Sequence, residues 1–309
     1  MKKVIIVLGP TAVGKTKTGI ELAKRFNTEI ISGDSVQVYK GLDIGSAKVT
    51  EEEASGIKHH LIDILEPNET YSVCDFQKAS RELIEKLDVP IIVGGTGLYI
   101  KAAISNYEFD APKRDFDFEE QYRDFSNEEL YKLLIEKDPK MCEVIHPNNR
   151  KRVLRALYAS FMNEPLSEKQ GKDELVYEPY IVYLNVEREL LYKRINERVL
   201  KMIEDGLERE VKDLYDKGIT PHAIGYQEWI PYFMGDVTLE TVIDEIQKNS
   251  RHLAKRQMTW FRHQMDTHFY EVNLNNIGET IDKIYEDILV FLKKEWFYDY
   301  IPYWYARLW

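Results

Sequence analysis

Cysteine is scarce in this chain, long apolar runs are missing, and positive charge is in deficit. Two cysteines, Cys74 and Cys142, are too few for a disulfide framework or a cysteine-rich zinc site, so we expect buried thiols in a reducing, cytoplasmic compartment. No stretch approaches the roughly 18 apolar residues of a membrane span, and we expect no membrane partner. The net charge of −11, from 42 basic and 53 acidic residues, argues against nucleic acid as a partner, although this total is only an average.

Short apolar runs alternate with amphipathic helical patterns over the first hundred residues. We expect strands at 4–8, 29–33, 60–65 and 90–94, and helices at 16–26, 73–87 and 97–104. Such alternation is typical of a parallel sheet with helices on both faces. Further along, we expect strands at 179–186 and 268–272, and helices at 187–215 (interrupted near Gly206), 238–262 and 277–294. The pattern predicts an α/β fold.

An acidic stretch interrupts this pattern. Residues 108–129 carry nine acids and three bases, and Pro112 lies among them. The stretch predicts the start of a helical insert, and a solvated acidic loop is an equal alternative. We therefore expect a first core part at 1–110, an insert at 111–145, and a return to the core at 146–309. Residues 200–235 are a candidate to join the insert in space.

The loop after the first expected strand matches the phosphate-binding pattern G-x-x-x-x-G-K-[ST]. It runs from Gly9 to Thr16 between a strand and a helix, which is the context that the motif requires. Backbone N–H groups there can surround phosphate oxygens, while Lys15 contacts the terminal phosphates and Thr16 holds Mg²⁺. The residues expected at a diphosphate or triphosphate are Gly9, Thr11, Ala12, Val13, Gly14, Lys15 and Thr16. A kinase, a hydrolysing NTPase and an enzyme with a diphosphate leaving group all remain open.

Asp34 follows the second expected strand, at the edge where parallel sheets bind ligands. A carboxylate there can serve as a general base facing the phosphate loop. A helix N-cap is the structural alternative.

Five segments together resemble the bacterial tRNA dimethylallyltransferases, also called tRNA isopentenyltransferases. They are GPTAVGKT (9–16), DSVQVYKGLDIGSAK (34–48), GGTGLY (94–99), HPNNRKRVLRAL (146–157) and AKRQMTWFR (254–262). The resemblance implies a P-loop NTPase-like parallel sheet with flanking helices and a helical insert. It also implies transfer of a dimethylallyl group from dimethylallyl diphosphate to N6 of the adenosine 3′ to the anticodon. A small-molecule P-loop kinase is the runner-up.

The resemblance also implies roles for single residues. Asp34 would be the general base and Thr96 would lie beside the same amine, while Lys15 and Arg198 would neutralise the diphosphate. Arg194 shares a helix face with Arg198, but we expect it to be solvated and paired with Glu197. The residues implied to contact the tRNA anticodon stem-loop are Asp34, Ser35, Val36, Gln37, Lys151, Arg152, Val153, Leu154, Arg155, His222, Gly225, Tyr226 and Gln227.

Positive charge gathers in two acid-free stretches, 149–155 and 248–263. Phosphate contacts from such stretches make RNA binding salt-dependent, and Arg251 and Arg256 join the expected tRNA contacts. Ordinary amphipathic surface is the alternative. Gln37, Tyr39 and Tyr226 are candidates either for stacking on bases or for core packing. We expect a monomer, and an aromatic tail at 295–309 that packs back on the core.

Overall fold

The computed structural model describes residues 1–106, 115–169 and 174–293. The expected aromatic tail lies outside them. The chain forms two compact units: Met1–Ile104 together with the chain from Val176 onward, and Ser105–Leu175. Within the described residues, none of the helices has the length and apolar content needed to span a bilayer.

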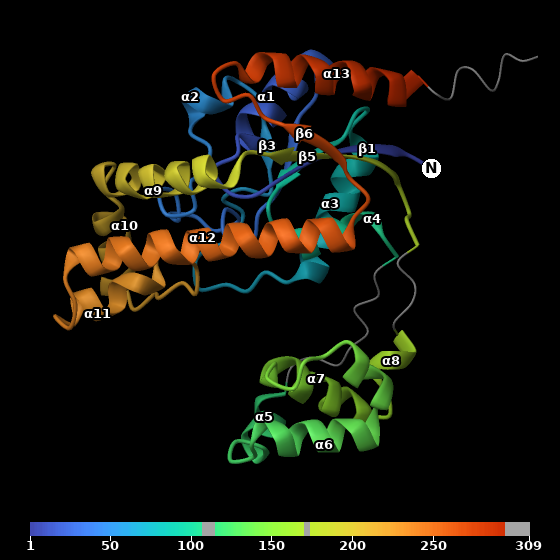
Figure 1. The fold of residues 1–309 in the computed structure, drawn as a ribbon, viewed down its shortest axis with the longest axis vertical. Coiled ribbons are helices and arrows are strands. Elements are labelled where there is room, and N and C mark those ends of the chain that lie inside the picture. The colour runs from blue at the N-terminus through green and yellow to red at the C-terminus, as the bar shows by residue number, and fades with distance from the viewer. Residues whose placement is uncertain (107–114, 170–173, 294–309) are drawn as a thin grey trace, which may run out of the picture. The chain divides into compact units, whose positions relative to one another are not determined.

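A six-stranded parallel sheet forms the centre of the first unit (Figure 1). Its strand order is β3-β2-β4-β1-β5-β6. The strands are β1 Lys3–Leu8, β2 Ile30–Gly33, β3 His59–His60, β4 Ile91–Gly94, β5 Glu178–Asn185 and β6 His268–Glu271. The expected α/β fold with a parallel sheet is confirmed.

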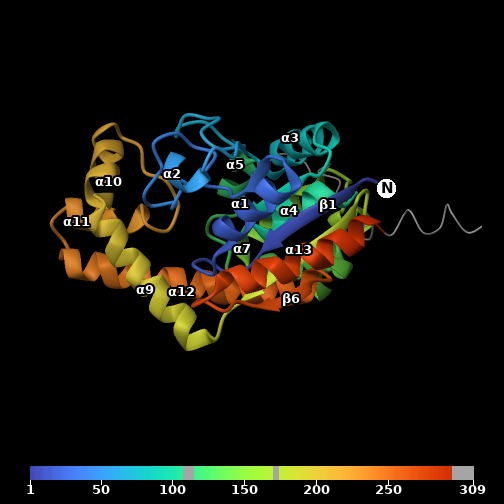
Figure 2. The same cartoon turned by 90° about the horizontal axis from the view of Figure 1, so that it is seen from above.

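Helices cover both faces of this sheet (Figure 2). Side chains of β1 alternate between two cores, because successive residues of a strand point to opposite faces. Ile5 and Val7 pack with α1 (Lys15–Phe26) and α13 (Ile277–Lys293). Val4, Ile6 and Leu8 pack with α3 (Val73–Lys86), α4 (Gly97–Ile104) and the last turn of α12 (Leu239–Gln264). Burial on both faces explains why the strand is a continuous apolar run.

A third apolar cluster lies in the same unit beyond the sheet. It joins α9 (Arg188–Glu204), α10 (Leu207–Asp216), η2 (Gln227–Trp229), α11 (Ile230–Phe233) and the start of α12. The expected interruption near Gly206 is confirmed, since Gly206 has φ +99° between α9 and α10. The candidate placement of 200–235 with the insert is wrong, because this segment packs within the first unit.

The second unit is a small helical bundle of its own. Its helices are α5 Phe116–Gln121, α6 Asn127–Lys137, η1 Pro139–Glu143, α7 Arg150–Phe161 and α8 Leu166–Lys169. Leu130 and Leu134 of α6 pack against Val153 and Leu157 of α7 in its core. The unit is therefore wider than the expected insert of 111–145, because α7 cannot bury its apolar face without α6.

The strand expected at 60–65 is the main local error in the first unit. β3 contains only His59 and His60, because Leu61 and Asp63 have positive φ angles of 62° and 54° that end the extended conformation. The short helix α2 (Glu51–Ala54) was not anticipated; a capping box between Thr50 and Glu53 starts it.

Candidate active site

Three loops meet at the carboxyl edge of the sheet. The phosphate loop follows β1, Asp34 follows β2, and Gly95-Thr96 follows β4. Because β2, β4 and β1 are neighbours in the sheet, their loops lie side by side. Ligands of parallel sheets bind at this edge, as the sequence predicted for Asp34.

The phosphate loop needs its two glycines. Gly9 has φ +151°, and a Cβ built there would lie 2.7 Å from the Leu184 carbonyl oxygen. Gly14 has φ +102°, a value that L-residues rarely adopt, and directly precedes α1. The N–H groups at the start of α1 therefore face the loop, as an anion site requires.

Two cations lie at this loop. Lys15 Nζ donates to the Pro10 carbonyl at 2.7 Å. Burial and the neighbouring Arg198 charge lower the pKa of Lys15 to about 7, although Asp34 opposes the shift. Arg198, on α9, donates to the Thr11 hydroxyl at 3.1 Å, and burial lowers the pKa of its guanidinium. No carboxylate of the described residues forms a salt bridge with either cation, and two such confined cations favour a bound anion.

Arg194 corrects our expectation of a solvated side chain. Its Nε donates to the Ala12 carbonyl at 3.0 Å, so it holds the phosphate loop from α9. Glu197, its expected partner, lies 3.8 Å from Lys193 instead. Gln257 on α12 was also missed: it accepts a hydrogen bond from Thr11 N at 3.1 Å. The four-residue spacing of Arg194 and Arg198 was the available signal for the first residue.

Asp34 has one occupied and one free carboxylate oxygen. Its Oδ1 accepts from Val36 N at 2.8 Å and from Gln37 N at 3.4 Å. No described residue donates to the other oxygen, and no helix starts here, so Asp34 is not an N-cap. Thr96 lies against the same turn, where its hydroxyl accepts from Ser35 N at 3.3 Å.

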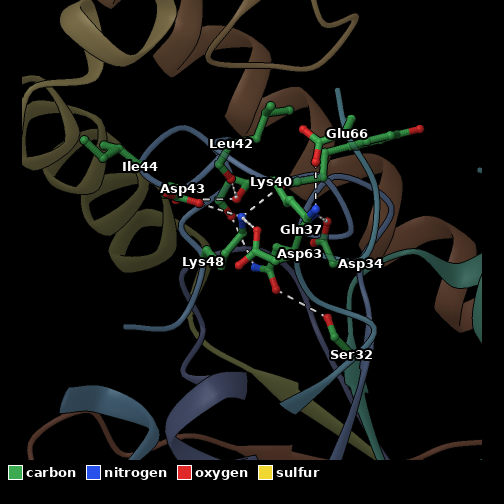
Figure 3. Close-up of polar contacts among 12 residues, drawn as sticks. Ser32, Asp34, Gln37, Lys40, Leu42, Asp43, Ile44, Lys48, Asp63 and Glu66 are labelled. Carbon is green, nitrogen blue, oxygen red and sulfur yellow. Dashed lines mark hydrogen bonds and ion pairs between the residues drawn. The ribbon is translucent and has the colours of Figure 1, made fainter. Parts of the chain in front are cut away.

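The segment after Asp34 is held by polar contacts of side chains that range from nearly buried to exposed (Figure 3). Gln37 Nε2 donates to the carbonyls of Ser46 and Ala47, both at 3.3 Å. The Lys48 ammonium, 6% exposed, lies between the carboxylates of Asp43 and Asp63 and also donates to the Tyr39 carbonyl. Gln37 therefore has a structural contact in addition to any contact with a ligand.

These groups line one open cleft of about 1520 Å³. Its walls include Thr11, Ala12 and Gly14–Thr16 of the phosphate loop, Asp34–Gln37, Thr96, Arg198 and Gln257. Gly9 and the buried Val13 are absent from the lining, so within the described structure they shape the phosphate loop rather than face the cleft. A cleft of this size can hold two substrates side by side.

The expected tRNA contacts divide by exposure. In the second unit, Lys151, Arg152 and Arg155 are exposed on α7, and no described carboxylate pairs with them. Val153 and Leu154 are corrections: their side chains lie in the core of the bundle, because α7 places positions 153, 154 and 157 on one apolar face.

In the first unit, His222, Gln227 and Arg256 are exposed, whereas Arg251 donates to Asn196 Oδ1 at 2.6 Å. Tyr226 is 1% exposed and donates to Glu210 Oε1 at 2.7 Å. Of the two alternatives for Tyr226, the structure gives core packing; Gly225 beside it is also buried.

The parallel sheet and the phosphate loop at its carboxyl edge define a P-loop-like α/β protein. A family model described as IPP transferase matches residues 37–264. The chain belongs to this family of transferases, and the resemblance inferred from its motifs is confirmed.

Relatives of known name agree over nearly the whole chain. The tRNA dimethylallyltransferase of Anoxybacillus flavithermus is 49% identical over 90% of this chain and 93% of its own length. That of Macrococcus caseolyticus is 46% identical over 92% of this chain and 95% of its own. The crystal structure of the tRNA isopentenylpyrophosphate transferase of Bacillus halodurans superposes on this chain with a TM-score of 0.73. The match covers 97% of this chain and 99% of that one, and the two sequences are 42% identical.

Proposed function

We propose that this chain transfers a dimethylallyl group from dimethylallyl diphosphate to N6 of the adenosine 3′ to the anticodon of tRNA, and releases diphosphate. One observation carries the proposal: a single cleft holds a cationic phosphate loop and, two strands away in the sheet, a carboxylate with a free oxygen. The names of the relatives supply the substrate class.

The donor half would stabilise the leaving group. As the allylic C–O bond breaks, negative charge grows on the diphosphate. Lys15 and Arg198 would neutralise that charge. Both side chains are partly buried, and electrostatic contacts are stronger where water is excluded. Arg194 would act indirectly, by holding the Ala12 carbonyl and with it the loop.

Mg²⁺ fits the donor set near Thr16. The Thr16 hydroxyl is exposed to the cleft and has no hydrogen-bond partner among the described residues. Those residues also contain no group of three His, Cys, Asp or Glu side chains that could hold a metal. Mg²⁺ prefers few protein ligands together with phosphate oxygens and water, so Thr16 would hold it beside the diphosphate. The ion would supply further neutralisation of the leaving group.

The acceptor half would activate the amine. The lone pair of an exocyclic adenine amine is delocalised, and N6 becomes a better nucleophile when its proton is accepted as the N–C bond forms. The free oxygen of Asp34 can accept that proton. Thr96, which fixes Ser35 and so the Asp34 turn, would lie beside the same amine.

A small hollow of about 50 Å³ adjoins both halves, and it would receive part of the prenyl tail. Its lining combines the apolar Ile30, Val49 and Val93 with Lys15, Thr16 and Asp34. Burial of all five carbons, in this hollow and in the cleft beside it, would contribute at most about 4 kcal/mol, at about 0.8 kcal/mol per methylene.

Exposed groups would contact the tRNA. In the proposal these are Lys151, Arg152 and Arg155 on α7, and His222, Gln227 and Arg256 in the first unit. The target base must leave its stack to reach Asp34, which costs less in a loop than in a duplex.

The test incubates the protein with dimethylallyl diphosphate carrying label in the allyl group, unmodified tRNA and Mg²⁺, without ATP. Label should enter RNA while diphosphate is released in equal amount. A parallel reaction with ATP and a small acceptor tests the kinase alternative, which ATP consumption there, together with no label in RNA in the first reaction, would support. Binding of RNA without either turnover would contradict both.

A further inference from the structure

The side chain of Gln257 bridges two loops of the cleft. Its Oε1 accepts from Thr11 N at 3.1 Å, and its Nε2 donates to the Gly95 carbonyl at 3.0 Å. A Cβ at position 95 would lie 2.6 Å from Gln257 Nε2, so the glycine makes the approach possible. Both ends of the amide are thus used, one on each side of the cleft.

This bridge completes a longer path in which hydrogen bonds alternate with short covalent links of the chain. On the donor side, the Thr11 hydroxyl accepts from Arg198 at 3.1 Å. On the acceptor side, Thr96 follows Gly95 directly and accepts from Ser35 N at 3.3 Å, next to Asp34. Within the described residues the path therefore runs from Arg198, the cation proposed to face the departing diphosphate, through Gln257 to the turn that holds Asp34, the proposed base.

The backbone of Gln257 is well fixed. Ala254, one turn earlier on α12, is buried against Leu191 and Ile195 of α9. Trp260, three residues later, lies so close to Gly97 that a Cβ there would be 2.2 Å from the indole ring. Because contacts on both sides immobilise this part of α12, the Gln257 amide can hold two loops at a set separation.

We propose that Gln257 is a positioning residue that sets the separation between the phosphate loop and the Asp34–Thr96 side of the cleft. The inference rests on the proposed function. In a direct transfer the amine must approach the allylic carbon as the diphosphate departs, so the two halves must keep a fixed distance. A misplacement of about 1 Å can cost roughly 100-fold in rate.

The first test replaces Gln257 by Met, which has a similar length but neither end of the amide. We expect kcat for transfer to fall roughly 10- to 100-fold. The KM for tRNA and the affinity for inorganic diphosphate should stay within about threefold, because Gln257 touches neither substrate in the proposal. The control is Gln264→Met, on the same helix. The Gln264 side chain accepts a hydrogen bond from Lys101, away from the two loops, so this variant should keep the wild-type kcat.

The second test is Gln257→Glu. It distinguishes a role of the two hydrogen bonds of residue 257 from a role of its side-chain volume. An ionised carboxylate accepts from Thr11 N but cannot donate to the Gly95 carbonyl, whereas a protonated one can do both. The ratio of variant to wild-type kcat should therefore rise as the pH falls. A ratio that does not change with pH, or a Gln257→Met enzyme with wild-type kcat, would overturn the inference.

The two proposals fail in different ways. If the wild-type protein transfers label to tRNA and Gln257→Met does so equally fast, only the positioning role is overturned. If the wild-type protein binds inorganic diphosphate but never transfers label, the proposed function is overturned and the positioning role with it.

Discussion

Asp34 and Lys15 are the two side chains whose proposed chemistry a single conservative substitution can test. One carboxylate oxygen of Asp34 accepts from two N–H groups, no described residue donates to the other, and the residue lines the cleft. Asp34→Asn preserves the shape of the side chain and its contacts in the turn but removes the proposed base. We expect kcat to fall about 10²- to 10⁴-fold while the affinity for inorganic diphosphate is retained. Asp88→Asn, at an exposed carboxylate before β4 with which no described residue pairs, controls for loss of charge alone. Wild-type turnover by Asp34→Asn, measured with labelled donor, would remove Asp34 from the mechanism.

If diphosphate binds at the phosphate loop as proposed, Lys15 should make its binding depend on pH. Its pKa of about 7 means that above pH 7 the free protein holds this amine mostly neutral. A bound diphosphate favours the ammonium, so binding should take up a proton, and affinity should fall by up to about tenfold per pH unit above pH 7. Calorimetry in two buffers of different ionisation enthalpy measures the uptake. Lys15→Arg should remove the share of the uptake that the lysine contributes, leaving only that of the diphosphate itself, and Lys17→Ala, at an exposed neighbour, should keep the wild-type value. Equal uptake by wild type and Lys15→Arg would contradict the assignment.

At the scale of elements, patterns in the sequence located nearly every strand and long helix of the first unit. They worked there because the central strands are buried on both faces and the long helices have one apolar stripe, as in β1 and α12. The sequence patterns failed where the extent or the packing of an element depends on contacts with distant residues or on single backbone angles. The apolar face of α7 does not reveal that α6 covers it, and the extended run after His60 does not reveal the positive φ angles of Leu61 and Asp63.

The site shows the same division. The phosphate loop, Asp34 and Thr96 could be found because a motif or a strand end marks each of them. Arg194 and Gln257 could not be assigned, since their partners are backbone groups 182 and 246 residues away in the chain. Contacts of that separation exist only in the folded chain.

Helix α10 gives an element-scale prediction about stability. Glu210 accepts N–H donors from Asp43, Ile44 and Gly45, and the Tyr226 hydroxyl as well. Tyr226→Phe removes only the last of these bonds, from a buried position. We expect a loss of about 1.5–3 kcal/mol in the free energy of unfolding, the usual range for a hydrogen bond to a charged group. Urea unfolding measures it, with Tyr215→Phe as the control because no hydrogen bond of that hydroxyl is present in the described structure. Equal midpoints for both variants would show that the bond adds nothing.

Helix α7 gives a second prediction, about RNA affinity. Arg152 is exposed and unpaired among the described residues, so Arg152→Ala should raise the KM for tRNA more than that for dimethylallyl diphosphate. If Arg152 contacts one phosphate, the slope of log KM for tRNA against log salt should fall by about 0.7–0.9. Lys132→Ala, on the exposed face of α6, is the matched control. Equal changes in both KM values would give Arg152 a structural role.

At the scale of the whole molecule, the net charge of −11 and a polyanionic substrate are compatible only if charge is distributed unevenly. The acids concentrate in stretches such as 108–129, whereas 149–155 and 248–263 contain none. A chain of this kind should bind tRNA through a few local contacts and should repel RNA that cannot make them. We therefore expect weak binding to a non-substrate RNA, with a log–log salt slope that corresponds to few phosphates at about 0.7 per contact. A salt titration by fluorescence anisotropy, with substrate tRNA beside it, measures both slopes. Tight binding of the non-substrate RNA that salt does not weaken would mean that contacts other than these basic stretches hold the RNA.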